Sequence, residues 1–132
     1  MKMIASVECI LYAADQKNSR DFYVSILGRE PILDVQGMTS FELCANTRLG
    51  LMPETGIAKI ITPAMPHPST GNGIPRCELY IYVSEINKTY SRIQSLGIPI
   101  ISSLQTRDWG DKAFYFADPD GHIIAFAEKI ST

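Results

Sequence analysis

Residues 7–15 read VECILYAAD, and residues 77–85 read CELYIYVSE. Glu8 of the first stretch aligns with Glu78 of the second, 70 positions later, and a tyrosine and a closing acidic residue align at the same spacing. Polar and apolar side chains alternate in both stretches, which is typical of strands. Self-similarity at a fixed spacing indicates a repeated structural unit. The chain is therefore predicted to contain two related halves, each opening with a strand.

The segment after each opening strand predicts a helix. In the first half, an apolar stripe over residues 22–27 has helical spacing, and either Asp15 or Asn18 can cap the helix start. Gly28 follows the stripe and can adopt the left-handed conformation that ends a helix. The second half repeats the stripe over residues 86–96 and the closing glycine.

Three short strands are expected after each helix. They are predicted over residues 31–35, 39–45 and 48–52 in the first half and over 100–106, 113–117 and 123–128 in the second. Each half then reads β-α-β-β-β. The predicted fold class is α+β, with two curved mixed sheets and the helices packed outside them.

The middle of the chain separates the two halves. We predict one domain over residues 1–132, made of unit one (1–53), a proline-rich link (54–75) and unit two (76–132). The prolines exclude a regular central strand or a long helix from the link, whereas a helical turn over residues 56–61 is compatible with its sequence. A connection of this length can be a lid, a dimer contact or a flexible connector.

Composition excludes several classes of function. The chain has 12 basic and 14 acidic residues and a net charge of −2, without the basic surplus that nucleic-acid binding needs. No apolar run approaches the roughly 18 residues of a membrane-spanning helix, and Glu8 interrupts the only stretch that could serve as a signal peptide. Cys9, Cys44 and Cys77 are an odd count without metal-ligand spacing, so we expect reduced, mostly buried thiols in a cytoplasmic protein.

Strand alternation places the two glutamates on corresponding faces. In the first strand Leu11 lies on the wholly apolar face, which should pack on the helix of its own unit, while Glu8 lies on the opposite face. Glu78 repeats this placement, and an apolar and aromatic wall with a few polar groups suits a small-molecule pocket. The alternative is that each glutamate is solvated or pairs with an arginine, such as Arg48, Arg76 or Arg107.

The arrangement resembles the vicinal oxygen chelate superfamily, which includes glyoxalase I, extradiol dioxygenases and bleomycin-resistance proteins. The motifs behind the resemblance are Ala14-Asp15, Ser19-Arg20-Asp21-Phe22-Tyr23 and Leu27-Gly28 in the first half, and Asp108-Trp109-Gly110, Phe114-Tyr115-Phe116 and Asp118-Pro119-Asp120-Gly121-His122 in the second. The resemblance spans nearly the whole chain. It is specific for the fold and not for a reaction, because this fold hosts many.

The resemblance also implies where a metal would bind. Metal-dependent members have ligands in the first and last strand of each unit, which correspond here to Glu8, Gly50, Glu78 and Ala125. Transition metals need three or four nitrogen or oxygen ligands, usually including histidine. Two of these four positions carry no donor, so we expect no metal site and no cofactor.

Without a metal ion, isomerisation and ring cleavage of the family type lose their Lewis acid. The resemblance then implies a metal-free, bleomycin-resistance-like protein that binds and sequesters a small molecule, as a homodimer with pockets where units of two chains meet. The candidate ligand-binding residues are Glu8, Ile10, Tyr12, Arg48, Met52, Glu78, Tyr80, Tyr82, Trp109 and Ala125. The two glutamates favour a cationic or amine-bearing ligand, and the indole of Trp109 offers either a stacking surface or a cap over the sheet end.

Two other functions stay open at this point. One is an enzyme, either a glyoxalase-like lyase or a dioxygenase with an atypical metal site, or a metal-free acid–base catalyst that uses Glu8 or Glu78. The other is a regulatory or interaction protein that uses the fold as a dimer scaffold.

Overall fold

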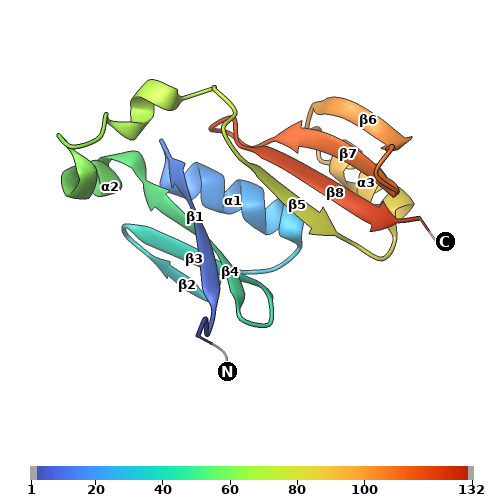
Figure 1. Ribbon diagram of the computed structural model, residues 1–132, viewed down its shortest axis with the longest axis horizontal. Helices are drawn as coiled ribbons and strands as arrows, with labels where there is room; N and C mark the ends of the chain where they lie inside the picture. The colour runs from blue at the N-terminus through green and yellow to red at the C-terminus, as the bar shows by residue number, and fades with distance from the viewer. Residues whose placement is uncertain (1–2, 131–132) are drawn as a thin grey trace. The chain divides into compact units, whose positions relative to one another are not determined.

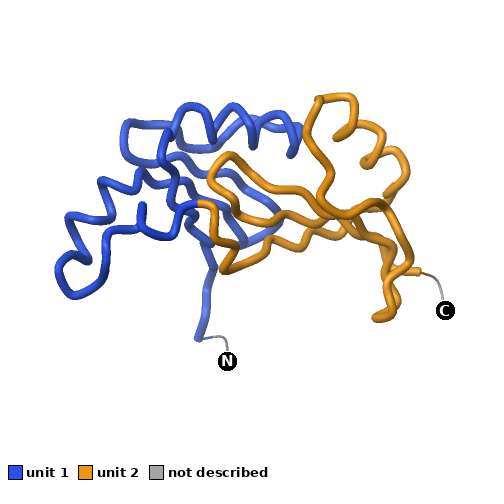
Figure 2. The backbone as a smooth tube through the Cα atoms, turned by 90° about the horizontal axis from the view of Figure 1, so that it is seen from above, with its two compact units in different colours: residues 1–72 blue, residues 73–132 orange. Residues whose placement is uncertain are grey.

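The computed structural model describes residues 3–130, and this part of the chain contains three α-helices, one 3-10 helix and eight strands (Figure 1). The strands form two four-stranded sheets. The chain divides into two compact units, the first ending at Asn72 and the second starting at Gly73 (Figure 2). Each is described below by itself.

Unit one contains β1 (Val7–Ala13), α1 (Gln16–Leu27), β2 (Leu33–Val35), β3 (Met38–Cys44), β4 (Thr47–Pro53), α2 (Glu54–Ile61) and the 3-10 helix η1 (Pro68–Gly71). Its strand order is β1-β4-β3-β2. The β1–β4 pair is parallel and the other two pairs are antiparallel. The segment predicted as a link thus lies in this unit up to Asn72, and its first helix begins at Glu54, directly after β4.

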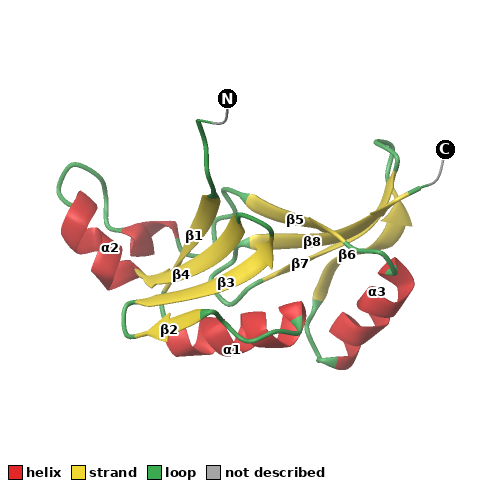
Figure 3. Ribbon diagram, turned by 90° about the horizontal axis from the view of Figure 1, so that it is seen from below, coloured by secondary structure: helices red, strands yellow, loops and turns green. Residues whose placement is uncertain are grey.

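Unit two contains β5 (Glu78–Tyr82), α3 (Ile86–Ser95), β6 (Ile100–Thr106), β7 (Asp111–Ala117) and β8 (Ile123–Lys129). Its strand order, β5-β8-β7-β6, and its strand directions repeat those of unit one. The α+β fold class and the predicted β-α-β-β-β repeat are therefore confirmed. Figure 3 shows α1 on one face of the first sheet and α3 on one face of the second.

The helix α1 forms where the sequence predicts it, and its ends are defined by two residues. The side chain of Asp15 accepts a hydrogen bond from the Asn18 backbone, so Asp15 and not Asn18 is the cap. Gly28 closes the helix with a φ of 67° and donates its N–H to the Val24 carbonyl. That left-handed conformation favours glycine because a Cβ would be strained there.

The core of each unit lies between its helix and its sheet. In unit one, Tyr23 and Ile26 of α1 are buried with Phe41, Leu49 and Leu51 of β3 and β4. Such aliphatic and aromatic side chains each stabilise the fold by roughly 1.5–3 kcal/mol when fully buried. The helix α2 follows β4 directly and approaches Met52, on the face of the sheet opposite α1.

The core of unit two is built from aromatic rings. Phe114 and Phe116 of β7 and Phe126 of β8 lie with ring centroids 5.8–5.9 Å apart, and Tyr90 of α3 packs 4.8 Å from Phe114. The start of α3 has a distant cap, because Glu128 Oε1 of β8 accepts from the Ile86 N–H at 3.0 Å. This contact places Glu128 on the helix side of the sheet.

The expectation that the cysteines are mostly buried is wrong. Cys9, Cys44 and Cys77 are all exposed. Cys9 has the same strand parity as the buried Leu11, but it lies near the beginning of β1, and β1 is an edge strand. The other two lie at the end of β3 and just before β5, where the sheets give little cover.

Among residues 3–130, no helix is long and apolar enough to cross a membrane.

Candidate functional site

In unit one, Glu8 reaches across β4. Its Oε2 accepts a hydrogen bond from Ser40 Oγ of β3 at 2.5 Å, although β4 lies between β1 and β3. The residue beneath this contact is Gly50, where a Cβ would lie 2.6 Å from Glu8 Oε2 and 2.5 Å from Met38 Cε. The missing side chain of Gly50 therefore leaves the space in which Glu8 and Ser40 meet.

The alternative that Glu8 pairs with an arginine is not seen. Arg48 is the register partner of Glu8 on β4, yet the two form no ion pair among the described residues. Ile10 and Arg48 are exposed, whereas Tyr12 and Met52 are partly buried near the other end of the strands. By strand parity these five predicted site residues share the face of the sheet away from α1.

In unit two, a buried carboxylate organises the corresponding face. Asp111, only 3% exposed, accepts hydrogen bonds from Tyr80 and Tyr82 on its Oδ2, both at 2.7 Å. Trp109 Nε1 donates to the hydroxyl of Tyr80 at 2.9 Å. Three predicted site residues are thus brought together by one that the sequence did not indicate.

Hydrogen bonds and burial determine the protonation states of Asp111 and of the tyrosines on this face. The hydrogen bonds from Tyr80 and then Tyr82 hold the pKa of Asp111 below its ordinary value. Burial raises the pKa of Tyr80 to about 12, so at neutral pH its hydroxyl keeps the proton that it donates to Asp111. Burial, followed by the negative charge of Glu78, raises the pKa of Tyr115 on the same face.

Two cations lie over tyrosine rings of this face. The Lys129 ammonium is 4.5 Å from the ring centroid of Tyr82, and the Arg107 guanidinium is 5.1 Å from that of Tyr115. Glu78 is exposed and forms no ion pair within the described residues, so the alternative that it pairs with Arg76 or Arg107 is not seen.

Sequence reasoning missed Ser40, Asp111 and Lys129. For Asp111 the signal was available in the chain's alternation, because Asp111, Ala113 and Tyr115 continue the same parity. The predicted strand begins at Ala113, so the prediction leaves Asp111 outside the sheet. The β7–β8 ladder extends to the pair Asp111 and Lys129, which adds both residues to the sheet.

The four positions that the family uses for metal ligands do not fit a transition metal here. Glu8 is hydrogen-bonded to Ser40, and the space above Gly50 is filled by Glu8 and Met38. Ala125 is fully buried and presents a methyl group between Tyr80 and Tyr115, its register partners. Each unit therefore contributes one carboxylate and no second nitrogen or oxygen donor at these positions.

A different group of potential ligand atoms lies in the turn before β8. Oxygen and nitrogen atoms of Asp118, Asp120 and His122 come within 4.8 Å of one another. Asp118 Oδ1 also accepts from the backbone N–H groups of Asp120 and His122, which accounts for its role in the turn. His122 is partly buried there, and it is remote in sequence from the first-strand glutamates.

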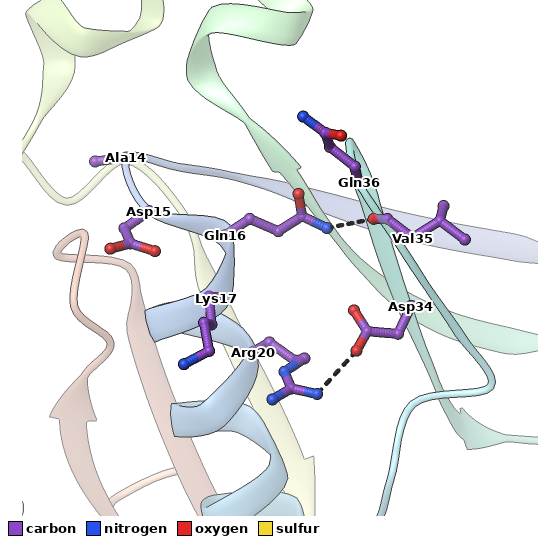
Figure 4. Close-up of a pocket in the computed structure, with 8 residues that line it drawn as sticks. All are labelled: Ala14, Asp15, Gln16, Lys17, Arg20, Asp34, Val35 and Gln36. Atoms are coloured by element: carbon purple, nitrogen blue, oxygen red, sulfur yellow. Dashed lines mark hydrogen bonds and ion pairs between the residues drawn. The ribbon is translucent and has the colours of Figure 1, made fainter.

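A pocket of about 660 Å³ lies at the start of α1, where residues 14–17, Arg20 and residues 34–36 line it (Figure 4). None of the predicted site residues lines this pocket. The Arg20 guanidinium is bound by Asp34 at 2.8 Å and by Asp21 at 2.7 Å, and both carboxylates raise its pKa. Gln16 ties the helix to β2 and β3 through Val35 and Thr39. Arg20 and Gln16 therefore connect α1 to β2 and β3 at this pocket, while Arg20 Nε is buried without a hydrogen-bond partner among the described residues.

Comparisons with known proteins agree with this architecture. The model of the glyoxalase-like domain family matches residues 7–131. No curated protein matches the sequence.

Solved structures with the same fold have low sequence identity to the chain. A glyoxalase/bleomycin resistance protein/dioxygenase from Nocardioides is 21% identical with a TM-score of 0.79, over 99% of this chain and 86% of the other. A lactoylglutathione lyase from Agrobacterium tumefaciens is 24% identical with a TM-score of 0.73, over 94% and 92%. At these identities the likeness concerns the fold alone. Together with the family model, it shows that the chain belongs to the glyoxalase-like domain family of the vicinal oxygen chelate superfamily.

Proposed function

We propose that this glyoxalase-like domain binds and sequesters a small organic molecule without a metal ion. The observation that carries the proposal is the donor set at the four family positions, where Gly50 and Ala125 supply no ligand atom. Glu8 and Glu78 alone cannot complete the coordination sphere of a transition metal. A Lewis-acid mechanism therefore has no support in these residues.

The faces of the two sheets that lie opposite α1 and α3 support the binding role. Unit two offers tyrosine and tryptophan rings held in place by Asp111, and Glu78 adds an exposed negative charge on the same face. Apolar and aromatic surface with a few oriented polar groups is typical of small-molecule sites. We place the ligand contacts at these predicted residues.

Metal analysis of the purified protein tests the first part of the proposal. The protein is grown with added nickel, zinc, iron and manganese, dialysed, and measured by inductively coupled plasma mass spectrometry. We expect well under one equivalent of any of these metals. One tightly held equivalent that is lost in both Glu8→Gln and Glu78→Gln would contradict the proposal.

The turn before β8 requires its own control. Metal that stays in the two glutamine variants but is lost in His122→Gln is bound by the turn residues, and it leaves the metal-free assignment of the family positions intact.

A thermal-shift screen tests the second part. A ligand that binds only the folded chain raises its Tm with concentration. We expect amines and aromatic compounds to raise the Tm of the wild type and to raise that of Trp109→Ala less. No shift across a broad library would instead favour an interaction or scaffold role.

The corresponding placement of Glu8 and Glu78 is the observation that favours catalysis as a second candidate. An enzyme would convert a glutathione hemithioacetal or a catechol, and Glu78→Gln would abolish that turnover. Under the binding proposal, neither the wild type nor the variant converts these compounds.

We also propose that the chain forms a homodimer. In each sheet the first strand, β1 or β5, is an edge strand, and β1 exposes the apolar side chains of Val7 and Ile10. Edge strands with exposed apolar side chains pair readily with another chain.

A further inference from the structure

Three aromatic side chains of unit two form a preorganised group, which we call the aromatic cluster: Tyr80, Tyr82 and Trp109. The rings of Tyr80 and Tyr82 meet edge to face, with centroids 5.3 Å apart. Their hydroxyls share one oxygen of the buried Asp111, and Trp109 is anchored on Tyr80. The hydrogen bonds fix the edges of the rings, so binding a ligand against their faces requires little further ordering.

Two of these three side chains remain half exposed. Tyr82 is 50% exposed and Trp109 is 56% exposed, although both take part in the hydrogen-bond network. Two carboxylates, Asp111 and Glu78, are on the same side of the sheet by strand parity. The same side also carries the cations Arg107 and Lys129, so the negative charge exceeds the positive charge only when the Lys129 ammonium leaves the ring.

One cation already lies on this surface. Lys129 Nζ is 4.5 Å from the centroid of the Tyr82 ring and donates a long hydrogen bond, 3.4 Å, to the Tyr82 hydroxyl. Attraction between an ammonium group and the face of an aromatic ring is the physical basis of this contact. The contact shows where an ammonium group can lie on unit two.

Lys129 is held far more weakly than the other cation of this face. Arg107 over Tyr115 donates to the carbonyls of Ser103 and Ala113 and to the hydroxyl of Ser102. Lys129 is exposed, and besides the attraction of its charge to Asp111 it donates one long hydrogen bond, so its flexible stem allows the ammonium group to leave the ring.

We propose that the aromatic cluster binds the ammonium group of a small organic cation on the face of Tyr82 that Lys129 covers in the free chain, and that the cation displaces Lys129. The inference rests on the proposed function and names its ligand class. A quaternary ammonium suits the position best, because it has no N–H to hydrogen-bond with water and gains most from an aromatic face.

Choline chloride is the probe, and the protein supplies its own reporter. Trp109 is the single tryptophan of the chain, so its fluorescence reports on the aromatic cluster alone. We expect a saturable change in fluorescence with choline at constant ionic strength. The neutral isostere 3,3-dimethyl-1-butanol should produce none at the same concentrations, and equal responses to the two compounds would overturn the proposal.

Substitutions identify the surface that binds. Tyr82→Leu should weaken choline binding about three- to tenfold, whereas Tyr82→Phe, which keeps the ring, should stay within about twofold of the wild type. Lys129→Met should strengthen binding by several-fold, because the internal competitor is gone.

Lys112→Met is the matched control for the charge change. Lys112 neighbours Asp111 on β7 but points to the other side of the sheet, where it donates to Asn87. The Lys112→Met variant should leave choline binding unchanged. Equal strengthening by Lys112→Met and Lys129→Met would indicate a general effect of net charge and would overturn the role of Lys129.

The two proposals fail in different ways. A metal-free protein that does not respond to choline overturns the cation site and leaves the metal-free binding function standing. A protein that holds a full metal equivalent at Glu8 and Glu78 yet still binds choline overturns the metal-free function alone.

Discussion

Gly50 shows how one absent side chain determines the polar contacts of a sheet face. Only a residue without Cβ leaves room for Glu8 to cross β4 and accept from Ser40. We expect Gly50→Ala to displace Glu8 and to lower the free energy of unfolding by about 1–2 kcal/mol, from the lost hydrogen bond and local overpacking. Urea denaturation measures the change.

Gly56→Ala is the control for the glycine substitution. Gly56 lies inside α2, and a Cβ there would meet only the flexible end of Met52 at 3.8 Å. This variant should be as stable as the wild type or more so, by up to about 1 kcal/mol. Equal destabilisation by the two substitutions would contradict the explanation for Gly50.

Asp111 gives unit two a predictable response to acid. Because its pKa in the folded chain lies below the ordinary value of 3.8, its contribution to stability is complete above that pH. The contribution is lost as the pH falls from there through the pKa of the folded state. We expect the Tm of Asp111→Asn to depend less on pH below about pH 4 than that of the wild type.

The neighbouring exposed carboxylate supplies a control for this acid response. Asp108→Asn should keep the wild-type dependence of Tm on pH, since Asp108 lies exposed in the turn. An acid slope that Asp108→Asn flattens as strongly as Asp111→Asn would contradict the assignment.

At the residue scale, the sequence identified the three members of the aromatic cluster and not the residue that organises it. Tyr80, Tyr82 and Trp109 are recognisable by type and parity. Asp111 follows Gly110, which marks a turn, and it precedes the strand predicted over residues 113–117. Only the pairing of β7 with β8 shows that the ladder continues through Asp111.

At the scale of elements, the helices α1 and α3 are capped at their N-termini in different ways. The N-cap residue of α3, Glu85, makes no side-chain capping bond, and Glu128 of β8 accepts from Ile86 instead. We expect Glu128→Ala to lower the free energy of unfolding by about 1 kcal/mol, as the loss of a helix cap does. Urea denaturation again provides the measurement.

Glu85→Ala serves as the comparison for the cap. Within residues 3–130 the carboxylate of Glu85 forms an ion pair with Lys88 alone, and that exposed ion pair contributes little. Its removal should change stability by about 0.5 kcal/mol or less. A larger loss in Glu85→Ala than in Glu128→Ala would show that the cap is local after all.

Element types followed from the sequence better than element ends did. Alternation and helical spacing predicted every strand and both principal helices, because these patterns reflect which side chains face the core. The ends depend on contacts beyond the pattern. Thus β7 begins two residues early, at Asp111, and α2 starts at Glu54 instead of spanning a turn over residues 56–61.

At the scale of the whole molecule, we expect the protein in solution to have twice the mass of the 14.6 kDa chain. Sedimentation equilibrium measures this mass. Replacing Ile10 by Lys on the exposed face of β1 should shift the equilibrium towards the monomer if β1 takes part in the association. A wild-type protein that sediments as a monomer at all concentrations would contradict the proposed dimer.

The internal repeat predicted the topology of both units, because each copy carries the same strand and helix pattern. It could not predict how each copy has diverged in its polar contacts. Glu8 is bound to Ser40 over a glycine, whereas Glu78 is exposed beside a tyrosine network. The same position in the repeat therefore has two different environments.

The distant cap of α3 has a consequence for the order in which the chain can become structured. The first helix carries its cap, Asp15, immediately before it, so this helix can start from local sequence as soon as it is synthesised. The helix α3 must wait for Glu128, which leaves the ribosome 42 residues after Ile86. We therefore expect the amide of Ile86 to gain protection from hydrogen exchange late in synthesis, together with the closing strand, while the helix of the first copy is already formed.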